Sequence, residues 1–138
     1  MIQISQTAVY ALQVIIELSR LRSDHAVRAK DIRGKTGVPL PFLSKILRRL
    51  VEKKLLLAQK GPHGGFLMAL PPEKIHLSDI FHAAGYNIEK ERCLLGLKKC
   101  GSANPCAIHH SWSFVKETFI SWAENVTVAD VIGLRKNK

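Results

Sequence analysis

Two short apolar runs around a turn rich in glycine and proline constrain the fold of this chain most. The runs cover residues 55–59 and 66–70, and the turn between them reads Lys-Gly-Pro-His-Gly-Gly over residues 60–65. Apolar runs that flank such a turn predict a β-hairpin, because glycine and proline adopt the backbone angles that a tight turn requires. Any helices in the chain must therefore pack around a small hairpin.

Three segments before the hairpin have helical patterns, over residues 5–20, 29–36 and 39–53. Ser5 is a candidate N-cap of the first helix, and Gly37 is placed to end the second. Three helices followed by a hairpin is the order of a winged helix, in which the second and third helices form the helix-turn-helix. The predicted fold class is therefore mainly α with a small β-hairpin wing.

The rest of the chain predicts a short helix over residues 77–84, an irregular loop over 87–106 and a long helix that begins at Pro105. Apolar residues on the long helix alternate in spacings of four and three, which is typical of a coiled-coil seam. The seam could pack on the chain's own core, but two tryptophans and a phenylalanine favour a dimerisation helix that pairs with a second copy. We expect residues 134–138 to be a frayed tail. The predicted dimer contacts are Ile108, Trp112, Val115, Phe119, Trp122 and Val126.

Positive charge is concentrated in the first half of the chain. The chain has 21 Lys and Arg against 11 Asp and Glu, a formal net charge of +10. Residues 1–70 hold twelve of the basic and four of the acidic side chains, whereas residues 71–138 hold nine and seven. A basic half favours the interpretation that this part of the chain binds a polyanion. The alternative is a basic surface that is only solvated.

Double-stranded DNA is the polyanion that a winged helix fits best. The third helix fits the major groove, and the hairpin tip can enter a minor groove. An alternative is that the basic residues form only a solvated helix face. The candidate DNA contacts are Arg28, Pro41, Ser44, Lys45, Arg48 and Arg49 in the helical part, and Lys60, His63, Gly64 and Gly65 at the hairpin.

All three cysteines of the chain lie within fourteen residues, at positions 93, 100 and 106. Their spacing matches neither a zinc finger nor a ferredoxin, but three thiols on one loop can converge on a metal. Lys98 and Lys99 flank Cys100 and favour its thiolate, the ligating form. His109 follows Cys106 by one helical turn and could be a fourth ligand. An iron–sulfur cluster is the first interpretation, a zinc site of three Cys and one His the second, and a metal-free thiol switch the third.

The chain resembles the Rrf-type winged-helix regulators of bacteria, the family of IscR, NsrR and CymR. The resemblance covers nearly the whole length. It rests on Tyr-Ala-Leu at 10–12, Pro-Leu-Pro-Phe-Leu at 39–43, the hairpin motif at 60–66 and the Cys…Cys…Cys-x-x-His-x-x-Trp string over 93–112. It implies a homodimer that crosses its C-terminal helices and binds a palindromic operator.

The same resemblance implies that Cys93, Cys100 and Cys106 hold an iron–sulfur cluster, with His109 in the place of the histidine ligand of IscR-like members. That arrangement goes with a two-iron cluster, and a four-iron cluster is the alternative. The position from which NsrR-like members supply an acidic ligand is Ala8 here, which disfavours nitric-oxide sensing. Six residues separate the first two cysteines where IscR-like members have five, and Ser44 replaces their acidic residue.

The predicted protein is a dimeric DNA-binding transcription regulator, a repressor or an activator, whose operator binding depends on the cluster. Residues 1–72 would be the DNA-binding domain, 73–104 the connecting helix and sensor loop, and 105–138 the dimerisation helix and tail. The sequence shows neither a bilayer-length apolar run nor a signal peptide, so we expect a cytoplasmic protein without a membrane partner. The rival classes are a metal-handling enzyme, a cluster carrier and a metal-binding protein–protein adaptor. No nucleophile–base pair or phosphate loop supports an enzyme.

Overall fold

A computed structural model describes residues 4–87, 93–98 and 100–136. In chain order its helices and strands are α1 Gln6–Leu21, α2 Ala29–Thr36, α3 Leu40–Glu52, β1 Leu56–Gln59, β2 Gly65–Met68, the 3-10 helix η1 Pro72–Lys74, α4 Leu77–Ala83, α5 His109–Asn125 and α6 Val128–Lys136. The fold is therefore mainly helical with one two-stranded hairpin, as predicted. None of the helices in the described parts is both long and apolar enough to cross a membrane.

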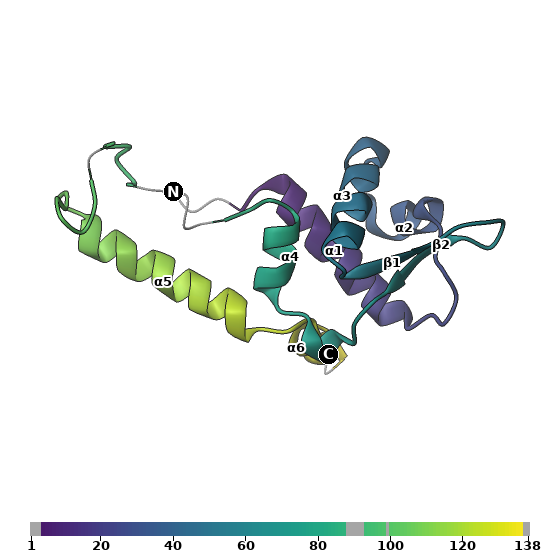
Figure 1. Cartoon of the computed structure of the whole chain (residues 1–138). Helices are drawn as coiled ribbons and strands as arrows, with labels where there is room; N and C mark the ends of the chain where they lie inside the picture. Colours follow the sequence, from purple (N-terminus) through teal and green to yellow (C-terminus); the bar gives the residue numbers. More distant parts are fainter. Residues whose placement is uncertain (1–3, 88–92, 99, 137–138) are drawn as a thin grey trace.

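Helix α1 is the centre of the molecule rather than its outer layer (Figure 1). Its first turn is capped by Ser5, whose hydroxyl accepts a hydrogen bond from the Ala8 amide at 3.2 Å. Helices α2 and α3 pack on one side of α1, and α4 and α6 pack on it as well. Because α1 has neighbours on several sides, the small residues Ala8 and Ala11 are fully buried together with Val14 and Ile15.

The helix-turn-helix forms where the sequence predicts it. Gly37 ends α2 with φ +73°, and its amide donates to the carbonyl of Arg33 at 2.8 Å. Helix α3 then begins at Leu40 and buries Leu43, Ile46 and Leu50 against the core. A left-handed residue at this point suits glycine, since other side chains meet a steric penalty there.

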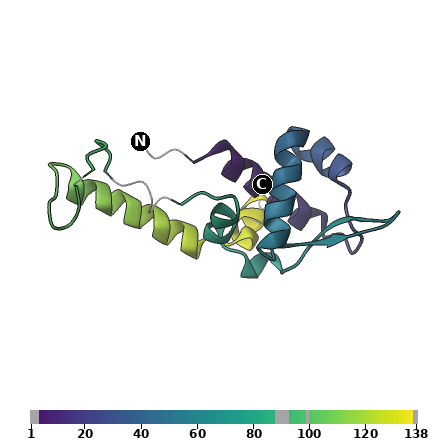
Figure 2. The ribbon, with the colours of Figure 1, turned by 45° about the horizontal axis from the view of Figure 1, so that its top comes forward.

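The hairpin pairs β1 with β2 in antiparallel register, from Leu56 opposite Met68 to Gln59 opposite Gly65. A third segment joins it, because Val27 and Phe66 exchange two backbone hydrogen bonds of 2.9 and 2.8 Å. The wing is therefore anchored to the loop that precedes α2. Figure 2 shows it extending from the helical body on the side opposite to α5.

The C-terminal part differs from the prediction of one long helix and a frayed tail. Helix α5 begins at His109, four residues after Pro105, because residues 101–108 form turns. It ends at Asn125, and α6 follows. Thr127 and Asp130 form a reciprocal cap at the start of α6, through N–H donors to Asp130 Oδ2 at 2.9 Å and to Thr127 Oγ1 at 3.1 Å. Residues 137–138 of the predicted tail lie outside the described residues.

Helix α6 returns to the body of the molecule. Val128 is fully buried and Ile132 is 9% exposed, and both belong to the same core as α1 and α4. Two backbone hydrogen bonds join the entrances of α4 and α6, from Leu77 to Val126 and from Val128 to Ile75. The core therefore extends beyond the boundary expected at residue 72, and α5 is the part that projects from it (Figures 1 and 2).

Candidate nucleic-acid interface and metal centre

The outward face of α3 carries four of the predicted DNA contacts. Pro41, Ser44, Lys45 and Arg48 are all exposed, on the side of the helix opposite to its buried leucines and isoleucine. This arrangement follows from the helical period, which places the polar and the apolar positions of this segment on opposite faces. Nothing in the core competes for these four side chains, so they are free to meet a ligand.

Arg49 behaves differently from the four exposed residues. Its guanidinium donates a 2.8 Å hydrogen bond to the carbonyl of Ala84, at the end of α4. Gly85 follows with φ +82°, and a Cβ at that position would lie 3.3 Å from the Arg49 Nη1 atom. Arg49 therefore ties α3 to α4 through this hydrogen bond, whereas its neighbour Arg48 is exposed.

The two glycines at the end of the hairpin turn are required by backbone packing. A Cβ on Gly65, whose φ is +150°, would lie 2.4 Å from the carbonyl oxygen of Val27. A Cβ on Gly64 would lie equally close to the carbonyl oxygen of Gln59. Both distances are far below van der Waals contact, so a side chain at either glycine would displace the strand or its neighbour. These positions shape the wing, which in turn presents the exposed Lys60.

Arg28 holds the wing from the side. Its Nη2 atom donates to the carbonyl of Pro62 at 3.2 Å, across the turn. His63, next to this carbonyl, is exposed. Arg28 therefore contacts the hairpin and helps to position it. From the sequence, Arg28 is predicted only as a DNA contact.

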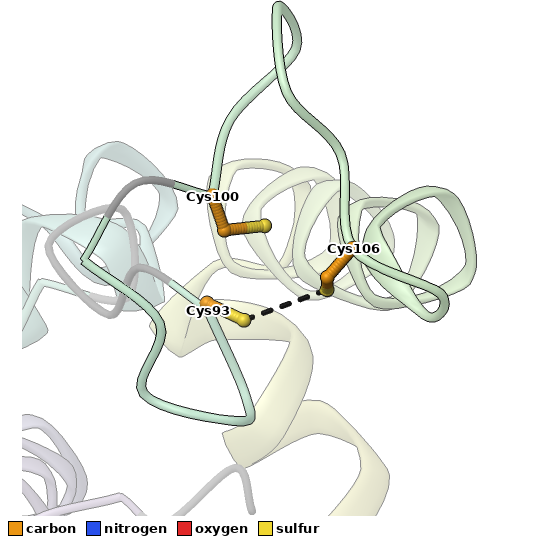
Figure 3. A group of neighbouring side chains, drawn as sticks. All are labelled: Cys93, Cys100 and Cys106. Atoms are coloured by element: carbon orange, nitrogen blue, oxygen red, sulfur yellow. Dashed lines mark hydrogen bonds between the residues drawn. The ribbon is translucent and has the colours of Figure 1, made fainter.

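Two tight turns bring the cysteines together. The first follows Cys93, where the amide of Gly96 donates to the Cys93 carbonyl at 3.0 Å and Gly96 has φ +74°. The second separates Cys100 from Cys106, because Gly101 and Asn104 exchange backbone hydrogen bonds of 3.2 and 3.0 Å. Figure 3 shows the three thiols converging from these turns.

The sulfur atoms form a compact group of potential ligands. All three Sγ atoms lie within 4.8 Å of one another, and those of Cys93 and Cys106 are 3.5 Å apart. His109, at the start of α5, places its Nδ1 atom 3.5 Å from Cys100 Sγ. The three half-buried thiols are thus a set of soft donors that could ligate one metal centre, with the His109 imidazole beside Cys100.

The backbone turn after Cys93 also favours its thiolate. Hydrogen bonding from the backbone of Leu97, and then of Leu95, together with the neighbouring thiols, lowers the pKa of Cys93 from 9.0 to about 7. A hydrogen bond that stabilises the charged form makes a thiol easier to ionise. Cys93 is therefore prepared to bind a metal as a thiolate near neutral pH.

The pKa of the Cys100 thiol is raised, so the flanking lysines do not decide how readily it ionises. The backbone hydrogen bond from Cys106 lowers the pKa of Cys100, but burial and the neighbouring Cys106 and Cys93 together outweigh it and raise the pKa. Adjacent thiols disfavour a second negative charge in the same small space. Lys99, one of the two lysines invoked, lies outside the described residues.

The predicted seam on α5 is divided between two environments. Phe119 stacks on Phe81 and on Tyr86, with ring centroids 6.0 and 6.2 Å apart, and so contacts the chain's own α4 region. Val126 also packs against the core. In contrast, Val115 is 41% exposed. Trp122 is 45% exposed and also lies against Phe81 of α4, with ring centroids 6.5 Å apart. Ile108 and Trp112 are half-buried near the cysteine turns.

One apolar residue of α5 lies outside the predicted seam. Phe114 is 69% exposed, the largest fraction among the large apolar residues that the structure describes as exposed. It lies next to Val115, away from the contact with α4. The spacing of four and three overlooks it. Phe114, Val115 and Trp122 are all partly exposed apolar residues of this helix, and we call these three residues the outer strip of α5.

The sequence matches the family model of Rrf2, described as an iron-dependent transcriptional regulator, over residues 4–133. It is 34% identical over 134 residues to a protein of Aquifex aeolicus (strain VF5) assigned as an HTH-type transcriptional regulator, which covers 96% of this chain and 92% of that protein. It is also 26% identical over 123 residues to the HTH-type transcriptional regulator IscR of Yersinia pseudotuberculosis, covering 89% and 74%.

Two solved structures share the fold. The structure of CymR, the global cysteine regulator of B. subtilis, matches with a TM-score of 0.80 and 19% identity, over 97% of this chain and 98% of that one. The T. potens IscR structure matches with a TM-score of 0.74 and 23% identity, over 99% and 89%. These homologues are regulators of transcription rather than enzymes, and the winged-helix prediction is confirmed.

Proposed function

The chain belongs to the Rrf2 family of transcriptional regulators, and from this premise we propose that it is a homodimer whose grip on a palindromic DNA operator depends on a cysteine-held metal centre. The observation that carries the proposal is the convergence of three thiols within 4.8 Å beside His109. In the same chain, the basic wing lies at the opposite end of the molecule from this group (Figures 1 and 2). The same polypeptide would thus sense at one end and bind DNA at the other.

On the DNA side, we assign Lys45 and Arg48 of α3 and Lys60 of the wing to phosphates, because all three are exposed cations on one basic unit. Pro41 and Ser44 would face base edges, since residues near the start of a recognition helix lie deepest in the major groove. His63 would follow the wing into the neighbouring minor groove. Two recognition helices of a dimer would require half-sites about one helical turn of DNA apart.

The outer strip of α5 is the surface we assign to the dimer. Its members Phe114, Val115 and Trp122 remain exposed in one protomer, although a helix buries such residues when a partner is available. A two-fold axis that pairs two α5 helices antiparallel would bring the cysteine turns of one protomer beside the winged helix of the other. Metal binding in one protomer would then alter the spacing of the two recognition helices through contact with the partner's winged helix. The wing of the same protomer is remote from its own metal centre.

We assign an iron–sulfur cluster to Cys93, Cys100 and Cys106, with His109 as the fourth ligand. The family's description as iron-dependent and the similarity to IscR support iron. A donor set of three sulfurs and one nitrogen goes with a two-iron cluster in IscR-like members, and four-iron is the alternative. When bound, a cluster supplies a group that responds to redox state and to iron supply. The chain's own part is to hold the thiols, through the turns at Gly96 and Gly101.

One observation favours zinc as a second candidate. Two thiolates bound to the same zinc ion at about 2.3 Å can be at most about 4.6 Å apart. The three sulfurs lie within 4.8 Å of one another, slightly more than this limit, so a small contraction would bring all three onto a single ion. A protein with zinc in this site would be a regulator without a cluster.

Purification without oxygen followed by metal analysis tests the proposal. We expect a coloured protein with equal amounts of iron and acid-labile sulfide, and a gel shift on fragments of its own genome that changes when a chelator removes the metal. Cys106→Ser should lose the metal and the change in gel shift, whereas Ser102→Ala, an exposed neighbour on the same loop, should keep both. Colourless protein with one zinc would assign the site to zinc. A gel shift that ignores metal removal would refute the sensing role.

A further inference from the structure

The recognition helix begins with an exposed apolar tip. Leu40 is 45% exposed and Phe42 is 44% exposed, and Pro41 between them is exposed as well. None of these three side chains has a hydrogen-bonding group. The side chains at the start of α3 therefore offer an approaching ligand apolar surface.

This exposure is a consequence of how α3 packs. The helix buries Leu43, Ile46 and Leu47 against the core, so the residues of its first turn extend past the edge of that contact. Phe42 is fixed in place by an edge-on contact with Tyr10, whose ring centroid is 5.5 Å away. Phe42 thus keeps a defined position while nearly half of its surface remains uncovered.

The surroundings of the tip indicate which ligand would cover it. The exposed cation Lys35 precedes the tip in the sequence, and the exposed cations Lys45 and Arg48 follow it. Helix α3 carries no acidic residue before Glu52, in its last turn. A contact surface for an apolar protein partner is depleted of such charge at its centre, whereas a polyanion matches it. DNA is therefore the occupant that the charge pattern fits.

In the major groove, the apolar feature that distinguishes the base pairs is the C5-methyl group of thymine. We propose that Leu40 and Phe42 read thymine methyl groups, so that each operator half-site carries thymines under the start of α3. This inference rests on the proposed DNA binding and adds to it a preference for particular bases. Lys45 and Arg48 would position the helix, and the tip would discriminate.

Deoxyuridine differs from thymidine only by the missing methyl group, and so it tests the proposal from the DNA side. A duplex selected from a random pool by the wild-type protein is synthesised twice, with thymidine or with deoxyuridine in the half-sites. We expect the dissociation constant to rise about fourfold for each thymine methyl group removed from beneath the tip, as burial of one methyl group implies. Leu40→Ala and Phe42→Ala should bring the ratio of the two constants towards one. Lys60→Ala should weaken both duplexes equally and leave the ratio unchanged.

The outcomes separate this inference from the proposed function. Selection of no duplex by the wild-type protein would refute DNA binding itself. Equal binding of the two duplexes by the wild-type protein would refute thymine reading and leave DNA binding intact. A ratio that survives in both tip variants would assign the reading to other residues. A change of oligomeric state in Leu40→Ala with an unchanged ratio would show that the tip contacts protein.

Discussion

In the winged-helix half, Ile46, Leu47 and Leu50 of α3 are at most 1% exposed, whereas on α5 Phe114 is 69% exposed and Trp122 is 45% exposed. Both helices carry large apolar residues at helical spacing. The difference is that α3 has α1 beside it, whereas α5 contacts α4 along one side, where Phe119 and Trp122 meet Phe81. The comparison teaches that the first half completes its core within one protomer, and that α5 does not.

Charge follows the same division. The basic side chains are concentrated on the half with the complete core, and the thiols lie on the arm that projects from it. A rigid basic unit suits a ligand whose shape is fixed, such as a DNA groove. An arm with an incomplete surface suits a part that must respond to a partner or to a metal. Perturbing the two halves should therefore give different kinds of defect.

The largest effect should come from a charge on the outer strip of α5. Val115→Asp would bury an unpaired carboxylate in the proposed interface, which costs about 3–5 kcal/mol. Because the interface is two-fold, each dimer would carry the substitution twice. We expect the dissociation constant of the dimer to rise at least about a hundredfold, as measured by sedimentation equilibrium. The melting temperature of the monomer should change little.

A matched variant and a contrasting one sharpen this first prediction. Glu117→Gln, an exposed position on another side of α5, should leave the dimer intact. Phe119→Asp should unfold the α4 region as well as disrupt assembly, because Phe119 stacks on Phe81 within the protomer. A Val115→Asp protein that remains dimeric would show that α5 pairs through a different surface.

The next largest effect should come from the completed core. Leu47→Ala removes a side chain that is 1% exposed and leaves a cavity between α3 and its neighbours. Such substitutions cost about 2–5 kcal/mol in the free energy of unfolding. Leu95→Ala, on the cysteine loop, truncates a leucine that is 58% exposed and should cost less than about 0.5 kcal/mol. Denaturant titrations of the two variants compare the halves directly, and equal destabilisation would contradict the division.

A smaller effect is expected at the base of the wing. Gly65→Ala would place a Cβ 2.4 Å from the Val27 carbonyl oxygen in a backbone conformation that alanine avoids. We expect a decrease of about 1–3 kcal/mol in the free energy of unfolding and weaker DNA binding. Gly34→Ala, in α2, meets nothing within 4 Å and should stabilise the helix by about 0.5–1 kcal/mol. Thermal melts and gel shifts of both variants would test this, and a neutral Gly65→Ala would show that the wing is not held by Val27.

Much of the winged helix was predictable because its signals are local. Gly37 ends one helix, the Gly-Pro turn makes the hairpin, and the spacing on α3 separates a buried face from an exposed one. The convergence of the cysteines with His109 was also predictable, since they lie within seventeen residues on one loop and one helical turn. Local backbone preferences and helical geometry decide all of these features.

The features that could not be predicted from the sequence depend on contacts between segments that are distant along the chain. Arg49 lies on the same helix as Arg48, but the Ala84 carbonyl that binds it comes from 35 residues further along the chain. The seam on α5 combines residues that contact α4 with residues that remain exposed, and periodicity alone does not distinguish them. The start of α6 is a different case, because Thr127 and Asp130 show the spacing of a capping box that could have been read.

The smallest predicted effect concerns that cap, and it tests how much the ionised cap contributes to the packing of α6 on the core. The Thr127 amide and then its hydroxyl lower the pKa of Asp130 below its usual 3.8. A carboxylate with a lowered pKa in the folded state contributes stability above its unfolded pKa and loses it as pH falls through the folded value. Asp130→Asn should therefore destabilise the protein near neutral pH, and the difference from wild type should shrink in acid. Asp24→Asn, which removes an exposed carboxylate beside the exposed His25, controls for the loss of one surface charge. If Asp130→Asn shifts the melting temperature equally at pH 7 and in strong acid, the ionised cap does not hold α6 against α1.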